Sequence, residues 1–147
     1  MKLFDAIAVS GSALEAERQR SEVIASNMAN AETTRTAAGG PFHRRQVVFG
    51  SSTPRTFGMT LATLNNNAPP AGMVRVADVV DDPTPPVMRY EPGHPDADQD
   101  GYVAYPSINP AMEMVDLMGS VRAYQLNASA ISAEKQMIQQ SIDILKA

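Results

Sequence analysis

Proline is confined to the middle of this chain. All 11 Pro of the 147 residues lie between Pro41 and Pro110, and seven of the nine Gly lie between Gly39 and Gly101. Residues 1–35 and 111–147 contain no Pro and one Gly each. Because proline breaks a helix interior and glycine weakens it, this distribution predicts a helix at each end and a non-helical insert between them.

The C-terminal arm carries an apolar residue at almost every alternating step of three and four from Met114. Nine of these ten positions are apolar, and Lys135 is the exception. The pattern predicts a helix from about Asn109 to Lys146, roughly 57 Å long at 1.5 Å per residue. A rod of that length needs a partner for its apolar seam. We expect an intersubunit seam made of Met114, Leu117, Val121, Tyr124, Ile131, Ile138, Ile142 and Leu145.

The N-terminal arm follows the same step more weakly, because five of eight positions are apolar and most of the others are small or polar. Small residues bury little area, so this helix is expected to become ordered only when it is packed. We expect the residues that face the C-terminal seam to be Leu3, Ile7, Leu14, Ile24 and Met28. The helix should stop after Asn30, with a turn into the insert formed by Asn27, Asn30, Thr33 and Thr34.

The insert has the composition of short strands joined by loops. Strand-forming residues gather at Arg44–Phe49, Met73–Val80, Val87–Tyr90 and Gly101–Tyr105. We predict an α+β fold in which long N- and C-terminal helices form a coiled-coil-type layer and a small β-rich domain is inserted between them. The expected divisions are residues 1–35, 36–108 and 109–147, with a mobile or partner-binding loop at 51–72.

Composition excludes several classes of function. The formal net charge is −4, whereas proteins that bind nucleic acid need a basic face. No apolar run approaches the roughly 20 residues that span a bilayer, and we expect neither membrane insertion nor a cleaved signal peptide. The chain has no Cys, and no catalytic motif accompanies His43 or His94. We therefore expect no enzyme activity, no cofactor and no metal.

One segment allows an alternative. Asp96-Ala97-Asp98-Gln99-Asp100-Gly101 matches the first positions of a calcium-binding loop, although Ser107 stands where such a loop has Glu. We favour an acidic turn before a strand. The alternative function is a soluble interaction module whose two helices pack within one chain and whose acidic turn binds calcium.

Charges are also unevenly placed. His43-Arg44-Arg45 and Arg55 form a basic island, and residues 75–101 contain seven acidic residues against two Arg. Solvated surface is the favoured interpretation. Complementary patches on neighbouring subunits, which would set register and partner choice, and pairing within one chain remain open.

The N-terminal arm resembles the signature of the bacterial flagellar axial proteins of the rod and hook at Ser10-Gly11-Ser12, at residues 24–31 and at Thr33-Thr34. The likeness covers nearly the whole chain except about residues 51–72. Segments similar to a proximal-rod member of this family are Gly39-Gly40-Pro41-Phe42-His43-Arg44-Arg45, Pro92-Gly93-His94-Pro95-Asp96-Ala97-Asp98 and Glu113-Met114-Val115-Asp116-Leu117.

This resemblance implies a structural role in the rod of the flagellar basal body, which spans the periplasm. Such proteins place both terminal helices in a shared layer around a hollow tube and transmit torque from the motor to the hook. The implied partners are copies of the chain, other rod proteins, membrane-ring and rod-adapter proteins, and the flagellar type III export apparatus. Family membership implies export without a cleaved signal.

Overall fold

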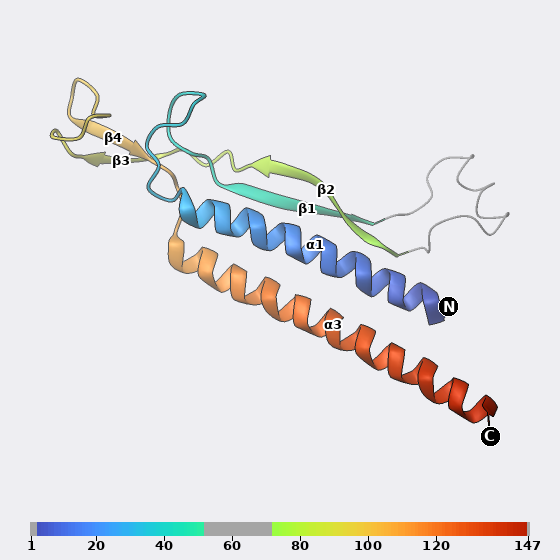
Figure 1. The fold of residues 1–147 in the computed structure, drawn as a ribbon. Helices are drawn as coiled ribbons and strands as arrows, with labels where there is room; N and C mark the ends of the chain where they lie inside the picture. Colours follow the sequence, from blue (N-terminus) through green and yellow to red (C-terminus); the bar gives the residue numbers. More distant parts are fainter. Residues whose placement is uncertain (1–2, 52–71, 147) are drawn as a thin grey trace, which may run out of the picture. The chain divides into compact units, whose positions relative to one another are not determined.

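The computed structural model describes the backbone of residues 3–51 and 72–146 and the side chains of residues 5–51 and 72–144. Two helices enclose four strands in the sequence, which confirms the predicted α+β class (Figure 1). Nearly all of the expected loop at 51–72 lies outside the described residues. The elements are α1 (Leu3–Ala29), β1 (Arg45–Ser51), β2 (Val74–Asp81), β3 (Val87–Tyr90), β4 (Tyr102–Tyr105) and α3 (Pro110–Lys146).

Both helices end where local chemistry favours it. After α1, the Asn30 side chain and backbone N–H both donate to the carbonyl of Ser26, and Thr33 N–H donates to the Asn30 carbonyl. Before α3, the Asn109 side-chain oxygen accepts from the N–H of Ala111, a typical N-cap, and Pro110 takes the first helical position. The predicted end of the first helix and start of the last are confirmed.

The strands form two separate two-stranded sheets, β1 with β2 and β3 with β4, and within each sheet the strands run in opposite directions (Figure 1). In the second sheet Val87 pairs with Tyr105 and Tyr90 with Tyr102. Gly101 precedes β4 at φ +81°. This backbone conformation suits glycine, and an added Cβ would lie 3.0 Å from the Tyr90 ring.

The described chain divides into two compact units. One consists of Met1–Gln19, Phe49–Ala77 and Ser120–Ala147, and its most buried side chains are Ala16 and Ser120. The other consists of Arg20–Val48 and Asp78–Gly119. Its buried side chains are both apolar and polar, and they include Ile24, Ala31, Val103, Tyr105, Asn27 and Glu113. In the described residues, neither helix is long and apolar enough to cross a membrane.

Candidate assembly surface

The predicted α1 face is mostly covered. Ile24 is buried, and Ile7, Leu14 and Met28 are half-buried. The side chain of Leu3 lies outside the described residues. The turn residues Asn30, Thr33 and Thr34 are also half-buried. Thr33 donates to Asn30, and Thr34 donates to the carboxylate of Asp96 at 2.8 Å, so this turn is tied to the loop before β4.

Asn27, predicted as a turn residue, has a different environment. Its side chain is 1 % exposed and donates to the backbone carbonyl of Arg45 at 2.8 Å and to the Glu113 carboxylate at 3.0 Å. Its oxygen accepts from the backbone N–H of Arg45 at 2.9 Å. Asn27 therefore joins the last turn of α1 to the start of β1 and the first turn of α3.

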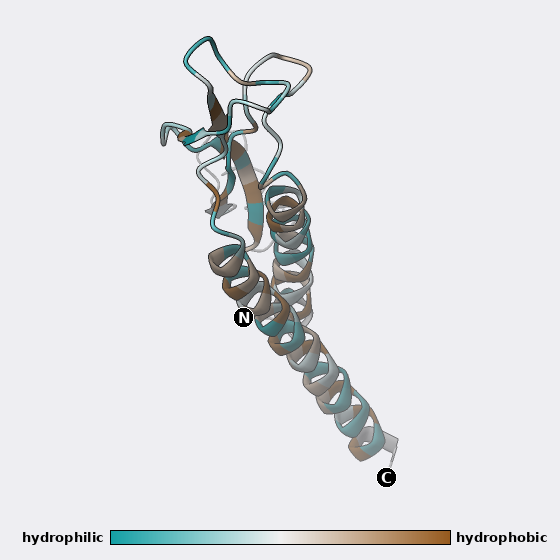
Figure 2. Cartoon of the chain, turned by 90° about the vertical axis from the view of Figure 1, so that its left-hand side faces the viewer, coloured by the Kyte–Doolittle hydropathy of each residue, from teal (hydrophilic) through white to brown (hydrophobic). Residues whose placement is uncertain are grey.

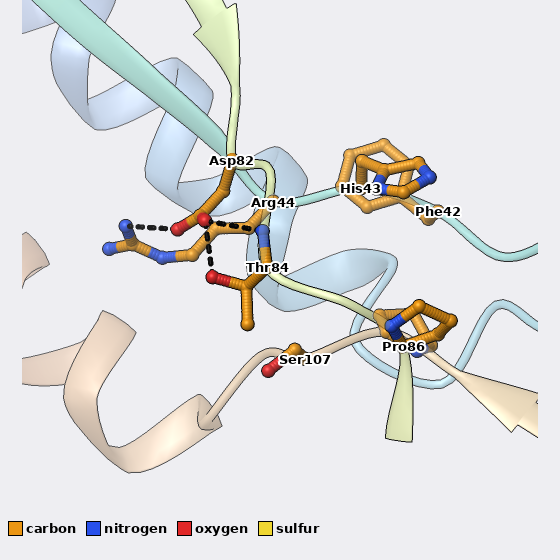
Figure 3. A pocket seen from close by; sticks show the side chains of 8 residues that line it. Phe42, His43, Arg44, Asp82, Thr84, Pro86 and Ser107 are labelled. Atoms are coloured by element: carbon orange, nitrogen blue, oxygen red, sulfur yellow. Dashed lines mark hydrogen bonds and ion pairs between the residues drawn. The ribbon is translucent and has the colours of Figure 1, made fainter. Parts of the chain in front are cut away.

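Arg44 completes this polar arrangement. Its Nε donates to Glu113 at 2.6 Å and a terminal nitrogen donates to Asp116 at 3.3 Å. Its other terminal nitrogen lies 3.9 Å from Asp82, which follows β2. The carboxylate of Asp82 also accepts from Thr84 through both the hydroxyl and the backbone N–H (Figure 3). These two bonds, with a smaller effect of the Arg44 charge, hold the pKa of Asp82 below its usual value.

On α3 the predicted seam divides into two sets. Leu117, Ile131 and Ile138 are half-buried, and Ser120 between them is fully buried, its hydroxyl donating to the Glu17 carbonyl at 3.2 Å. The other described members are 40–48 % exposed: Met114, Val121, Tyr124 and Ile142. The side chain of Leu145 lies outside the described residues. The exposed set is free to contact another chain, so its assignment to an intersubunit seam stays a prediction.

Several exposed apolar residues on α3 were not predicted. Apolar residues recur along the whole helix (Figure 2), and those most exposed do not follow the three-four step. The missed residues are 48–76 % exposed: Met112, Val115, Met118, Leu126, Met137 and Ile144. When the residues of α3 are placed around the helix axis at 100° per residue, most of these residues lie on the side opposite Glu113, Leu117 and Ser120. This angular separation could have been found from the sequence.

The roles of buried Glu113 and half-buried Arg44 were also missed. Glu113 lies four residues before Leu117 and seven before Ser120, so it belongs to the covered line of α3. The interpretation of the basic island as solvated surface is wrong for Arg44, whose side chain is 25 % exposed and bridges three carboxylates. Pairing within the chain also accounts for Arg45 with Asp81 at 3.5 Å and Arg35 with Asp96 at 3.6 Å.

The acidic turn is organised by its own hydrogen bonds. The Asp98 carboxylate accepts from the backbone N–H groups of Asp100 and Tyr102, and Asp96 is engaged by Thr34 and Arg35. Among the described residues no group of three His, Cys, Asp or Glu side chains is arranged to hold a metal ion. Nothing in the fold favours the calcium-binding alternative.

A second polar contact lies at the base of the β3–β4 sheet. The Tyr105 hydroxyl donates to the Glu91 carboxylate at 2.9 Å, and the Arg89 guanidinium lies 4.5 Å from the centre of the Tyr105 ring. The bond to Glu91, with burial and the Glu91 charge, raises the pKa of Tyr105. The His94 ring accepts a hydrogen bond from the backbone N–H of Asp96, and this bond stabilises the turn between them.

Two hollows lie beside charged residues of the described chain. The one beside Arg44 and Asp82, lined also by Phe42, His43 and Pro86, has a volume of about 10 Å³ (Figure 3). That is about the space needed for one water molecule. A wider hollow of about 400 Å³ between Arg35 and Asp96 is open and is formed largely by Gly, Pro and Ala.

Comparisons with known proteins agree with this architecture. The family described as "Flagella basal body rod protein" matches residues 7–35, and "Flagellar basal body rod FlgEFG protein C-terminal" matches residues 99–144. The chain is similar to the flagellar basal-body rod protein FlgC of Borreliella burgdorferi, at 37 % identity over 99 % of both chains. It is also similar to FlgC of Bacillus subtilis, at 37 % identity over 99 % of this chain and 100 % of the relative.

FlgC of Escherichia coli O157:H7 is again 37 % identical, over 98 % of each chain. These alignments run through both helices and the strands between them. A match of this extent and identity, together with two helices that enclose small antiparallel sheets, establishes the family: the chain belongs to the FlgC flagellar basal-body rod proteins.

Proposed function

We propose that this chain is a structural subunit of the flagellar proximal rod and polymerises through its terminal helices into the hollow shaft that carries motor torque to the hook. Its family consists of structural rod proteins and not of enzymes. The location that follows is the rod of the basal body, where the chain assembles with copies of itself and with other rod proteins.

The observation that carries the proposal is the exposure of large apolar side chains along α3. Four seam residues are 40–48 % exposed, and Val115 and Leu126 are exposed by 63 % and 66 %. Full burial of an exposed apolar side chain is worth about 1.5–3 kcal/mol, and each of these partly exposed side chains would gain a share of that. Neighbouring helices in a shared layer would provide this burial, which supports assembly through α3.

The same reasoning assigns roles to the parts of the chain. Residues 1–35 and 109–147 would form the axial layer, in a coiled-coil-type arrangement with neighbouring subunits. Residues 36–108 would form the outer domain. The contacts between subunits would include the exposed seam of α3 together with Ile138 and Ile131, which are half-buried within one chain.

Further partners follow from the position of a rod at the base of the flagellum. We infer contacts with membrane-ring and rod-adapter proteins and passage through the type III export apparatus. Export requires a chain that unfolds easily, and the long α3 with its exposed apolar residues is consistent with this. Amide exchange in the free subunit should then be fastest in the parts of the two helices that are distant in sequence from Asn27 and Glu113.

Deletion of the gene in its host, followed by electron cryotomography of the cell envelope, tests the proposal. We expect membrane rings without a rod, restored by the intact gene. Complete basal bodies in non-swimming cells would point to an accessory role, and normal flagella with normal swimming in a strain without a second copy would contradict the proposal.

A further inference from the structure

Five polar residues form what we call the register cluster: Asn27, Arg44, Asp82, Glu113 and Asp116. They come from the end of α1, the residue before β1, the residue after β2 and the first turns of α3. Asn27 and Glu113 are each 1 % exposed and belong to the largest fully buried side chains of the described residues. At the contact between Asn27 of α1 and Glu113 of α3, the chain therefore buries a carboxylate and not an apolar side chain.

Apolar packing alone defines the relative position of α1 and α3 poorly. The face of α1 consists mainly of Ala, Ser and single large residues such as Ile24 and Met28. On α3, apolar residues occur on several sides of the helix, among them Met114, Val115 and Leu117. A slip of one turn, about 5.4 Å, would exchange many of these apolar contacts for similar ones, although fully buried Ser120 leaves little room for a larger side chain.

The register cluster does not tolerate such a slip. The side-chain NH2 group of Asn27 donates to the Arg45 carbonyl at 2.8 Å and to Glu113 at 3.0 Å. Its side-chain oxygen accepts from the Arg45 N–H at 2.9 Å. Glu113 receives Asn27 on one oxygen and Arg44 on the other. Moving either helix by one turn would leave the buried carboxylate without donors, which is strongly unfavourable.

We propose that the register cluster fixes the register of α1 against α3 and selects one helix pairing, without adding net stability over an apolar contact. A buried polar group that determines register at no gain in stability is well documented in helical assemblies. The consequence for assembly rests on the proposed function, because only a subunit with the correct register would present its apolar side chains in the order that its neighbours require.

The first test measures stability and register in the purified full-length chain. Arg44→Met alone should lower the melting temperature by about 10 °C, because Glu113 loses its cation. The double variant Arg44→Met/Glu113→Leu should melt within about 5 °C of the parent or above it, since the buried carboxylate and its cation are removed together and Asn27 keeps its two bonds with the Arg45 backbone.

Spin labels report the register directly. The chain has no Cys, so Ala29→Cys and Met118→Cys, at exposed positions on α1 and α3 within one compact unit, provide unique labels. The parent should give one narrow distance distribution. The double variant should give a second, shifted population, because a slip of one helical turn moves one label by about 5 Å along its helix axis.

The assembly test uses the deletion strain. The double variant should fail to restore swimming even though it folds, whereas Glu15→Gln, which removes an exposed carboxylate paired with Arg18, should restore it. A double variant that swims, that gives a single distance, or that melts as low as Arg44→Met overturns the proposal. If the deletion strain swims without the gene, the proposed function fails, and the distances in the purified chain still decide the register.

Discussion

The two sides of the first turns of α3 have opposite chemistry. One side presents Glu113, a charged residue that is 1 % exposed and bonded to Asn27 and Arg44. The other presents Met112, Val115 and Met118, which are 61–63 % exposed. A self-sufficient domain places its residues the other way round, with apolar side chains inside and charges in water.

This contrast indicates a division of tasks. The covered side is specific: its donors and acceptors have defined partners and allow one arrangement of the chain. The uncovered side is adhesive, because apolar area gains free energy against any complementary apolar surface. The subunit thus combines defined polar contacts on one side of α3 with exposed apolar side chains on the other.

The largest expected effect comes from a charge in the seam. Ile138→Asp should abolish assembly, because an unpaired carboxylate in a shared apolar seam costs several kcal/mol. Swimming in soft agar by the complemented deletion strain is the measurement. Gln139→Asp, at the exposed neighbouring position, is the control and should swim. Normal swimming of Ile138→Asp would exclude this seam.

Met118→Asp tests the adhesive side. Met118 is 61 % exposed, so its replacement should change the free energy of unfolding of the purified chain by less than about 0.5 kcal/mol. If neighbours cover this side of α3, the same variant should not restore swimming. Normal swimming would show that Met118 faces solvent in the assembled rod and would limit the contrast to the free subunit.

Arg44→Ala tests the specific side. It leaves Glu113 buried with only Asn27 as donor, and we expect the free energy of unfolding to fall by about 3 kcal/mol in urea titrations. Arg18→Ala is the matched control, because both side chains of the Arg18–Glu15 pair are 55 % exposed and such pairs contribute less than about 1 kcal/mol. Equal effects of the two substitutions would mean that the burial around Glu113 has no energetic weight.

Ser120→Leu tests whether close contact of the helices depends on small side chains. Ser120 is fully buried and its hydroxyl reaches the Glu17 carbonyl, so a larger residue should destabilise by about 1–3 kcal/mol through overpacking. Ser120→Ala, which loses only the hydrogen bond, should cost about 1 kcal/mol. A Leu variant as stable as the Ala variant would show that the helices can separate freely here.

The smallest expected effect is on the stability of the chain at low pH. The pKa of Asp82 is lowered in the folded chain, so its contribution to stability is present above the ordinary Asp pKa of about 3.9 and is lost as the pH falls through the lower folded value. Thr84→Val removes the hydroxyl that is the main cause of the shift. It should flatten the fall in stability below about pH 4, measured by thermal unfolding at several pH values. An unchanged slope would contradict the role of Thr84.

The periodic parts of this fold were accessible from sequence. The absence of proline from both arms and the three-four pattern from Met114 predicted the helices, and runs of strand-forming residues predicted strands such as Val87–Tyr90 at its observed bounds. These features depend on neighbours in the sequence. The length of the C-terminal apolar seam also indicated that one chain would not bury it completely, and several of its residues are exposed.

The register cluster was not accessible in the same way. Asn27 and Glu113 are 86 residues apart, and Arg44 is 69 residues from Glu113. Local propensity assigns Asn27 to a turn and Arg44 to solvent, and only tertiary contact reverses this. Periodicity likewise found one apolar line on α3 but missed residues such as Met118 and Leu126, because exposed apolar residues need not repeat at one step.

Methionine dominates the uncovered start of α3: Met112, Met114 and Met118 are all at least 48 % exposed. An unbranched thioether side chain can adopt many shapes at little cost, so one helix face of this kind can fit partners that differ in sequence. A subunit at the junction between different rod proteins would benefit from that tolerance. The same sulfur atoms are open to oxidation to sulfoxides before assembly, and the polar product would not suit an apolar contact. Incorporation into a rod would therefore also act as chemical protection.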